Sequence, residues 1–91
     1  MLEREIEAYL VKRVKEMDGV AIKFTSPSRR SSPDRLVILP KAKLFFVELK
    51  APGKYATEAQ LRWHQELRDY GLIVYVIDTK ELVDSTLEKW K

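Results

Sequence analysis

The stretch Leu44-Phe45-Phe46-Val47-Glu48-Leu49-Lys50 is apolar for its first four residues and then carries two opposite charges. Side chains alternate between the two faces of a β-strand, so Glu48 and Lys50 project from one face while Leu49 points to the other. The stretch therefore predicts a strand whose end presents a carboxylate and an ammonium group together at one edge of a sheet.

A second apolar run, from Asp34 to Leu39, precedes this strand and is separated from it by Pro40-Lys41-Ala42. A connection this short favours a hairpin, so the two runs are predicted to be antiparallel neighbours. The hairpin would bring Asp34, at the start of the earlier strand, beside the end of the later one. We therefore expect the side chains of Asp34, Glu48 and Lys50 to converge.

The segments before this hairpin fit an α/β pattern. Apolar residues recur at helical spacing from 2 to 17, which predicts an amphipathic helix that ends before Gly19. The β-branched and aromatic run 20–25 predicts a strand, and it leads into a polar loop rich in Ser and Pro.

After the hairpin, a second helix is expected over 57–70, because Thr57-x-x-Gln60 is a capping-box pattern. The nearly unbroken apolar run 72–77 predicts a strand that is buried on both faces and central in the sheet. Asp78-x-x-Glu81 is expected to cap a final helix. The predicted class is α/β, with the order αβββαβα: a small mixed sheet flanked by helices, in a single domain over residues 1–91.

The composition narrows the possible functions. A chain that is 45% hydrophobic and 34% charged has the balance of a globular protein, and no apolar run approaches the length of a membrane span. Because there is no cysteine, disulfides, thiolate zinc sites and a cysteine nucleophile are excluded. The single histidine, His64, gives little support to Ser-His-Asp chemistry. The first residues show no secretory leader, so we expect a cytoplasmic protein.

Positive charge is concentrated in the middle of the chain. Between Lys23 and Lys54 there are eight Lys or Arg residues and two acids, a net charge of +6, whereas the remainder of the chain carries −3. A basic segment of this kind suits a phosphate backbone as partner. Its two acids, Asp34 and Glu48, are those that a metal-dependent nuclease would need.

Two carboxylates and an ammonium group are suited to phosphodiester hydrolysis. Magnesium prefers hard oxygen ligands and needs only one or two carboxylates from a protein, which Asp34 and Glu48 would supply. A bound ion can neutralise a phosphate oxygen and lower the pKa of a water, and Lys50 can position that water. The alternative is that Glu48 and Lys50 form an ordinary surface ion pair, which contributes little.

The motifs Ser32-Pro33-Asp34-Arg35 and Phe46-Val47-Glu48-Leu49-Lys50-Ala51-Pro52-Gly53 resemble those of the virus-type replication-repair nuclease (VRR-NUC) family, part of the PD-(D/E)xK nuclease superfamily. The similarity extends over nearly the whole chain, although relatives often have Gly in place of Ser32. It implies a restriction-endonuclease-like core, Mg²⁺ or Mn²⁺ as cofactor, and a phage or mobile-element origin. The resemblance also implies roles for four residues. Asp34 and Glu48 would be the metal-binding acids, the main-chain carbonyl of Leu49 a further metal ligand, and Lys50 the catalytic lysine.

Members of this family commonly add a glutamate from the first helix to the metal site. Glu7 shares the inward-facing stripe of that helix with Leu10 and Val14, so it is the preferred candidate. Glu3 lies one turn earlier on the same side and is the alternative, whereas Glu5 points away.

The family pattern also has a glutamine near the start of the second helix, which corresponds to Gln60. This residue shares a helical stripe with Trp63, Leu67 and Tyr70 that would direct it inward, toward the strand ends. Alternatively, Gln60 only closes the capping box. His64 lies off this stripe and is expected on the surface, close to DNA.

The basic middle segment is the predicted DNA contact, because Lys and Arg bind phosphates and Ser donates hydrogen bonds to them. The expected contact residues are Lys23, Ser26, Arg29, Arg30, Ser32, Arg35 and Lys54. The other aromatic side chains are expected in the core or at an interface rather than stacked on bases: Trp63, Trp90, Tyr9, Tyr55, Tyr70 and Tyr75.

Small members of the family resemble Holliday junction resolvases, which implies a structure-specific endonuclease that acts on branched DNA as a homodimer. The interface is expected on the first helix or on the last helix with Val83, Leu87 and Trp90. The alternatives are a non-catalytic DNA-binding module, a restriction-type nuclease, and an α/β interaction protein whose charges form structural ion pairs.

Overall fold

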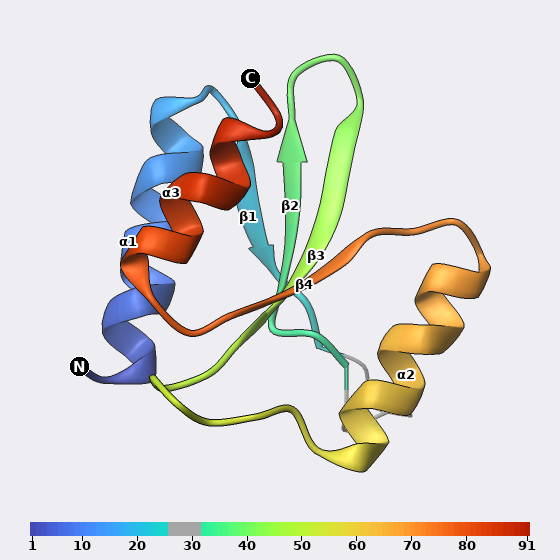
Figure 1. Cartoon of the computed structure of the whole chain (residues 1–91). Coiled ribbons are helices and arrows are strands. Elements are labelled where there is room, and N and C mark those ends of the chain that lie inside the picture. Colours follow the sequence, from blue (N-terminus) through green and yellow to red (C-terminus); the bar gives the residue numbers. More distant parts are fainter. Residues whose placement is uncertain (26–31) are drawn as a thin grey trace.

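The computed structural model describes residues 1–25 and 32–91, and its elements follow the predicted order αβββαβα (Figure 1). None of the helices in the described part of the chain is long and apolar enough to cross a membrane. The elements are α1 (Glu3–Glu16), β1 (Val20–Lys23), β2 (Arg35–Leu39), β3 (Lys43–Leu49), α2 (Glu58–Asp69), β4 (Val74–Ile77) and α3 (Lys80–Glu88).

The strands form a mixed sheet with the order β1-β2-β3-β4. β1 with β2 and β2 with β3 are antiparallel pairs, while β3 and β4 are parallel. Leu39 pairs with Lys43 across the predicted hairpin, and Arg35 pairs with Val47. The start of β2 therefore lies beside the end of β3, as the short connection predicts.

The prediction that the strand over 72–77 is central was wrong. In the described sheet, β4 pairs only with β3 and forms an edge. Its apolar residues contact helices on both faces instead: Ile77 packs in the core with α1 and α3, and Val74 packs beside α2. The run is apolar because helices cover both faces at this edge.

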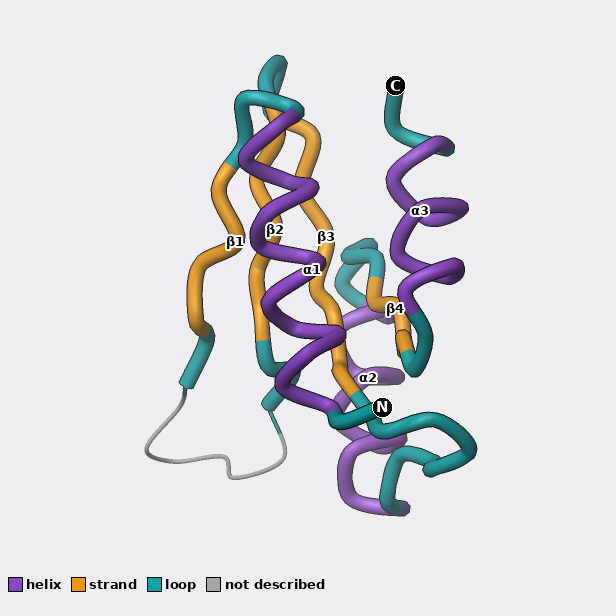
Figure 2. The backbone as a smooth tube through the Cα atoms, turned by 90° about the vertical axis from the view of Figure 1, so that its left-hand side faces the viewer, coloured by secondary structure: helices purple, strands orange, loops and turns teal. Residues whose placement is uncertain are grey.

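Helices α1 and α3 lie side by side on one face of the sheet, and α2 lies on the other face (Figures 1 and 2). Strand β3 therefore faces two different environments. Its residues Phe45, Val47 and Leu49 enter the larger core, whereas Phe46 lies on the opposite face, in the cluster under α2. The larger core includes Ile6, Leu10, Val14, Val37, Phe45, Val47, Leu49, Ile77, Val83 and Leu87. The smaller cluster under α2 is Phe46, Leu67 and Val74, with Phe24, Leu36, Trp63 and Leu72 packed against it.

Part of the predicted dimer interface is buried inside the molecule. Val83 and Leu87 on α3 are 0% exposed and belong to the larger core. Trp90 also packs against this core, stacked on Phe45 with 4.8 Å between ring centroids. The expectation that Val83 and Leu87 form an interface was therefore wrong, because they face the sheet of their own chain.

The helix ends confirm one predicted cap and correct another. Thr57 and Gln60 form the reciprocal capping box at the start of α2. At α3 the cap is Thr79, whose side-chain oxygen accepts a hydrogen bond from the amide of Leu82, rather than Asp78. The carboxylate of Asp78 instead accepts a bond from the Gly53 amide at 3.4 Å.

Gly19, after α1, is required for close packing. A Cβ atom at this position would lie 2.6 Å from the carbonyl oxygen of Ile38, so the backbone of the turn packs directly against β2. The left-handed conformation that ends the helix is taken by Asp18, with φ 62°. The glycine therefore serves the approach of two backbones rather than the reversal of the chain.

The aromatic side chains divide into buried and exposed groups. Tyr9, Tyr75 and Trp90 are partly buried against the larger core, as predicted. Tyr55 and Tyr70 are 88% and 79% exposed, so of the two expected locations, core and interface, the core is ruled out for them. Tyr70 follows the last turn of α2, where the inward-facing stripe has already ended at Leu67.

Candidate functional site

Asp34 and Glu48 lie side by side on the face of the sheet that carries α2. Asp34 immediately precedes Arg35, the partner of Val47, so it stands opposite Glu48 in the β2–β3 register. Asp34 is close enough to Glu48 that, in addition to burial, a hydrogen bond and the charge between the two carboxyl groups both raise the pKa of Glu48. The main chain of β3 also holds Asp34: the amide of Leu49 donates a hydrogen bond to its Oδ2 atom at 2.7 Å.

Lys50 follows β3 and completes the group predicted from the sequence. Its Nζ atom lies 3.9 Å from Oε2 of Glu48, and its side chain is 15% exposed. The Lys50 amide donates to the carbonyl of Ile77 at 3.0 Å, so the strand remains attached to β4 at this point. The structure therefore brings two carboxylates and one ammonium group together where β2 starts and β3 ends.

Glu48 is almost completely buried, with a side-chain exposure of 2%. Burial raises its pKa from 4.5 to about 8, with further increases from the hydrogen bond and the negative charge of Asp34, while Lys50 acts in the opposite direction. Burying a carboxylate beside a second acid is costly unless positive charge compensates the two groups. The arrangement therefore has the electrostatic character of a cation site.

Helix α2 supplies one hydrogen bond to each oxygen of Glu48. The Gln60 Nε2 atom donates to Oε2 at 3.2 Å. The same amide group accepts a hydrogen bond from the Thr57 amide through Oε1 at 2.8 Å. Gln60 thus combines both of its proposed roles, because its oxygen closes the capping box while its nitrogen faces the site.

His64 holds the other oxygen of Glu48, and the prediction that it lies on the surface was wrong. The side chain is 0% exposed, and its Nε2 atom lies 3.2 Å from Oε1 of Glu48. The signal for this position is its spacing of four residues from Gln60, which places both on one face of α2. Burial and the nearby positive charge of Arg68 lower the pKa of His64, so the ring is neutral at pH 7.

Glu7 and Arg35, predicted for metal and DNA respectively, are paired with each other. The Arg35 Nε atom lies 2.9 Å from Oε2 of Glu7, and the guanidinium also donates to the Ala21 carbonyl. Arg35 pairs with Val47 in register and therefore points to the α1 face of the sheet, away from the α2 face. This ion pair joins α1 to the start of β2.

Glu3, in the first turn of α1, interacts electrostatically with the residues of the site. Its pKa is raised, first by partial burial and then by the negative charge of Asp34, while Lys50 lowers it and Glu7 raises it. Of the two glutamates considered from the sequence, Glu3 therefore interacts electrostatically with both Asp34 and Lys50.

The other predicted DNA contacts lie around this edge. Lys23 ends β1 and Lys54 follows β3, and both are exposed. Ser32 accepts a hydrogen bond from the Trp63 Nε1 atom at 3.2 Å, which ties the chain before β2 to α2. Three more predicted contacts lie outside the described residues: Ser26, Arg29 and Arg30.

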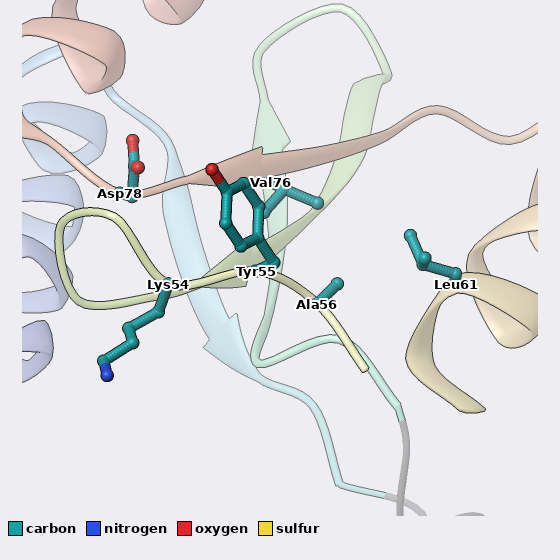
Figure 3. A pocket seen from close by; sticks show the side chains of 6 residues that line it. All are labelled: Lys54, Tyr55, Ala56, Leu61, Val76 and Asp78. Carbon is teal, nitrogen blue, oxygen red and sulfur yellow. The ribbon is translucent and has the colours of Figure 1, made fainter. Parts of the chain in front are cut away.

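A pocket of about 300 Å³ lies between the segment that follows β3, helix α2 and the end of β4 (Figure 3). Val76 in its wall pairs with Glu48 in the β3–β4 register, and Leu61 follows Gln60 on α2. The surface of the pocket is mostly apolar, with an ammonium group and a carboxylate at its rim. The lining residues are Lys54, Tyr55, Ala56, Leu61, Val76 and Asp78.

The donor set suits a divalent ion that keeps several of its waters. No group of three or more His, Asp or Glu side chains able to hold a metal exists within residues 1–25 and 32–91. Magnesium needs only one or two carboxylates, which Asp34 and Glu48 provide, and the predicted third protein ligand is the carbonyl of Leu49. The residues present therefore fit the hard, oxygen-binding ion expected from the sequence.

No family model matches the chain. The chain is 50% identical over 80 residues to "Putative nuclease p44" of Acyrthosiphon pisum secondary endosymbiont phage 1, an alignment that covers 88% of this chain and 86% of that protein. A solved structure named "VRR_NUC domain" covers 98% of this chain, with 97% of its own length matched, a TM-score of 0.91 and 31% sequence identity. Both similarities span almost the entire lengths of the proteins compared, and they confirm the family resemblance seen in the motifs. The chain therefore belongs to the VRR-NUC family of nucleases, which are phosphodiester hydrolases.

Proposed function

We propose that this nuclease is a metal-dependent endonuclease that cleaves DNA at the Asp34–Glu48 pair. The observation that carries the proposal is the buried Glu48 carboxyl group beside the partly buried Asp34, with Lys50 3.9 Å from Glu48. A stability function does not explain this pair, because a buried acid next to a second acid destabilises a fold. A surface ion pair does not describe it either, because Glu48 is 2% exposed.

The residues have separable roles in this proposal. Asp34, Glu48 and the Leu49 carbonyl would hold a Mg²⁺ or Mn²⁺ ion, which would supply positive charge for the scissile phosphate and a lowered pKa for a water molecule. The Lys50 ammonium group orients that water and offsets the negative charge that develops on the phosphate. The Gln60 amide fixes one oxygen of Glu48, so the carboxylate keeps its orientation through the reaction.

We favour Glu3 over Glu7 as the acid that the first helix contributes. Glu7 is already paired with Arg35, whereas Glu3 interacts with Asp34 and Lys50 and has no salt bridge within the described part of the chain. Its carboxylate would contact the ion through water, because it is not part of a three-acid cluster.

DNA would approach on the side of Lys54 and the adjoining pocket. The exposed Lys23 and Lys54 can bind backbone phosphates, and the exposed ring of Tyr55 beside the apolar pocket can contact an unstacked base. A substrate with unpaired nucleotides would use both features, which favours branched DNA over plain duplex. Arg35 would act indirectly, by holding β2 to α1 through Glu7.

A homodimer remains part of the proposal, with its interface on the sheet rather than on α3. Val20, Ile22 and Leu44 are 50%, 44% and 38% exposed. All three lie on the face opposite the larger core, where α2 covers only the smaller cluster around Phe46. An apolar sheet surface of this kind suits a second copy of the chain, which would present two sites to a branched substrate in the cytoplasm.

A cleavage assay on branched and linear DNA with Mg²⁺ or Mn²⁺ tests the function. We expect metal-dependent cleavage by the wild type and its loss in Asp34→Asn and in Lys50→Met. Asp69→Asn and Lys12→Met are matched controls, because these two side chains are exposed on other surfaces. Both controls should cleave like the wild type.

The alternatives predict different results in the same assay. A non-catalytic DNA-binding module would bind branched DNA without cleaving it under any metal condition. A restriction-type nuclease would cut linear duplex at least as fast as branched DNA. Cleavage that survives in Asp34→Asn would place the reaction elsewhere and contradict the proposed site.

A further inference from the structure

His64 is a fully buried polar residue whose placement is not explained by packing. Its Nε2 atom lies 3.2 Å from Oε1 of Glu48, while Nδ1 is buried with no hydrogen-bond partner among the described residues. A buried polar atom without a partner costs stability, and an apolar side chain of similar size would avoid that cost. A histidine here therefore requires a reason other than core formation.

The geometry around Glu48 provides that reason. The terminal torsion of a glutamate is soft, so a free carboxylate samples a broad range of orientations. In this structure Gln60 contacts Oε2 and His64 contacts Oε1, and both come from one face of α2. Two contacts from one rigid helix fix the plane of the carboxylate, whereas a single contact would let it rotate.

The ring must donate rather than accept in this contact. Glu48 is ionised when it binds a cation, and an ionised carboxylate offers only acceptor atoms, so the single proton of a neutral imidazole must then lie on Nε2. In this tautomer Nδ1 carries no proton, and Nδ1 is the ring nitrogen that has no partner among the described residues. The unpartnered nitrogen and the contact with Glu48 are thus consistent with one arrangement.

We propose that His64 is a positioning residue that, with Gln60, holds the Glu48 carboxylate in the orientation required to bind a divalent cation. This inference rests on the proposed metal site, and it assigns no contact between His64 and the substrate. Partners that orient metal ligands typically change metal affinity by about 10- to 100-fold when they are removed. His64 should therefore affect cation binding more than folding.

Calorimetric titration of the metal-free protein with Mn²⁺, without DNA, tests this inference. His64→Met keeps an unbranched apolar side chain but has no donor, and we expect its Mn²⁺ affinity to fall about 10- to 100-fold. His64→Gln can place an amide donor near the position of Nε2, so its affinity should stay close to that of the wild type. Gln65→Met, one residue further on the exposed face of α2, is the matched control.

Two further measurements separate a positioning role from a structural one. The melting temperature of metal-free His64→Met should stay close to that of the wild type, because the substitution removes the unpartnered Nδ1 atom together with the contact to Glu48. In cleavage assays, the loss in His64→Met should be recovered by raising the Mn²⁺ concentration. If His64→Met does not fold, His64→Asn takes its place, since its shorter side chain stays polar but does not reach Oε1.

Each result has a definite reading. Wild-type Mn²⁺ affinity in His64→Met would overturn the inference, and so would equal losses in His64→Met and His64→Gln. Those outcomes would leave the nuclease proposal intact if Asp34→Asn still abolished binding. If the wild type bound no Mn²⁺, the metal site itself would be refuted, and the role of His64 with it.

Discussion

Replacing Glu48 by Gln should remove a pH dependence from the stability of the metal-free protein. The pKa of Glu48 is raised from 4.5 to about 8 in the folded chain, so between these values the folded state keeps a proton that the unfolded state has lost. The stabilisation from this group is complete below pH 4.5 and is lost as the pH rises through 8. At about 1.4 kcal/mol per pKa unit, the whole effect amounts to about 5 kcal/mol.

The useful window lies at neutral to alkaline pH. His64 has a lowered pKa, so its own contribution has the opposite sign and changes as the pH falls below 6.5. Between about pH 7 and pH 9, a carboxyl group with a folded pKa of about 8 loses about 1.4 kcal/mol of its stabilisation. For a domain of this size, that loss lowers the melting temperature by roughly 6–11 °C.

Thermal or urea unfolding with a chelator present, at both ends of this window, provides the measurement. The wild type should lose stability relative to Glu48→Gln, which mimics the protonated acid, and Glu81→Gln should follow the wild type because Glu81 is exposed. Added Mn²⁺ should stabilise the wild type most at the alkaline end. Equal changes in the wild type and Glu48→Gln would refute the assignment of a buried, proton-holding acid.

Three other substitutions probe the lysine, the pocket and the fold. Lys50→Met should lower the single-turnover cleavage rate about 100-fold or more, while calorimetry shows that Mn²⁺ binding is retained. If Mn²⁺ affinity fell together with the cleavage rate, Lys50 would be needed for metal binding and not for the reaction alone. Tyr55→Ser should weaken binding of DNA with unpaired nucleotides in fluorescence anisotropy, whereas Tyr70→Ser, equally exposed at the other end of α2, should not. Gly19→Ala should destabilise the protein by about 1–3 kcal/mol in urea unfolding, since its Cβ would meet the Ile38 carbonyl oxygen; a smaller loss would mean that the turn relaxes.

The central residues of the site could be predicted because they depend on local periodicity. Glu48 and Lys50 are two residues apart at the end of one strand, and the short hairpin places Asp34 beside them. Alternation along a strand and the length of a hairpin connection are local properties that one sequence reveals. The same alternation also predicts that Arg35, next to Asp34, points to the opposite face of the sheet.

The errors concern relations between elements. On α2, the inward-facing stripe runs through Gln60, His64 and Leu67, whereas the predicted stripe ran through Trp63, one position earlier than His64. The residue type did not decide between them, because histidine occurs both on the surface and in the interior of proteins. For β4, an apolar run indicates that both faces are covered and does not reveal the position of the strand in the sheet. Which acid of α1 meets Arg35 depends on how the helix crosses the sheet, and that contact spans 28 positions of the chain.

Strand β3 allows the chemistry and the folding of this protein to be altered separately. Side chains alternate along this strand, so the core residues Phe45, Val47 and Leu49 point to the face opposite that of Glu48. Asp34 is held by the amide nitrogen of Leu49, an atom that every residue except proline provides. A designer could therefore exchange the side chain at position 49 for another of similar volume without disturbing the acid pair. Homologues can likewise change the side chains of this hydrophobic layer while the Asp34–Glu48 pair stays in place.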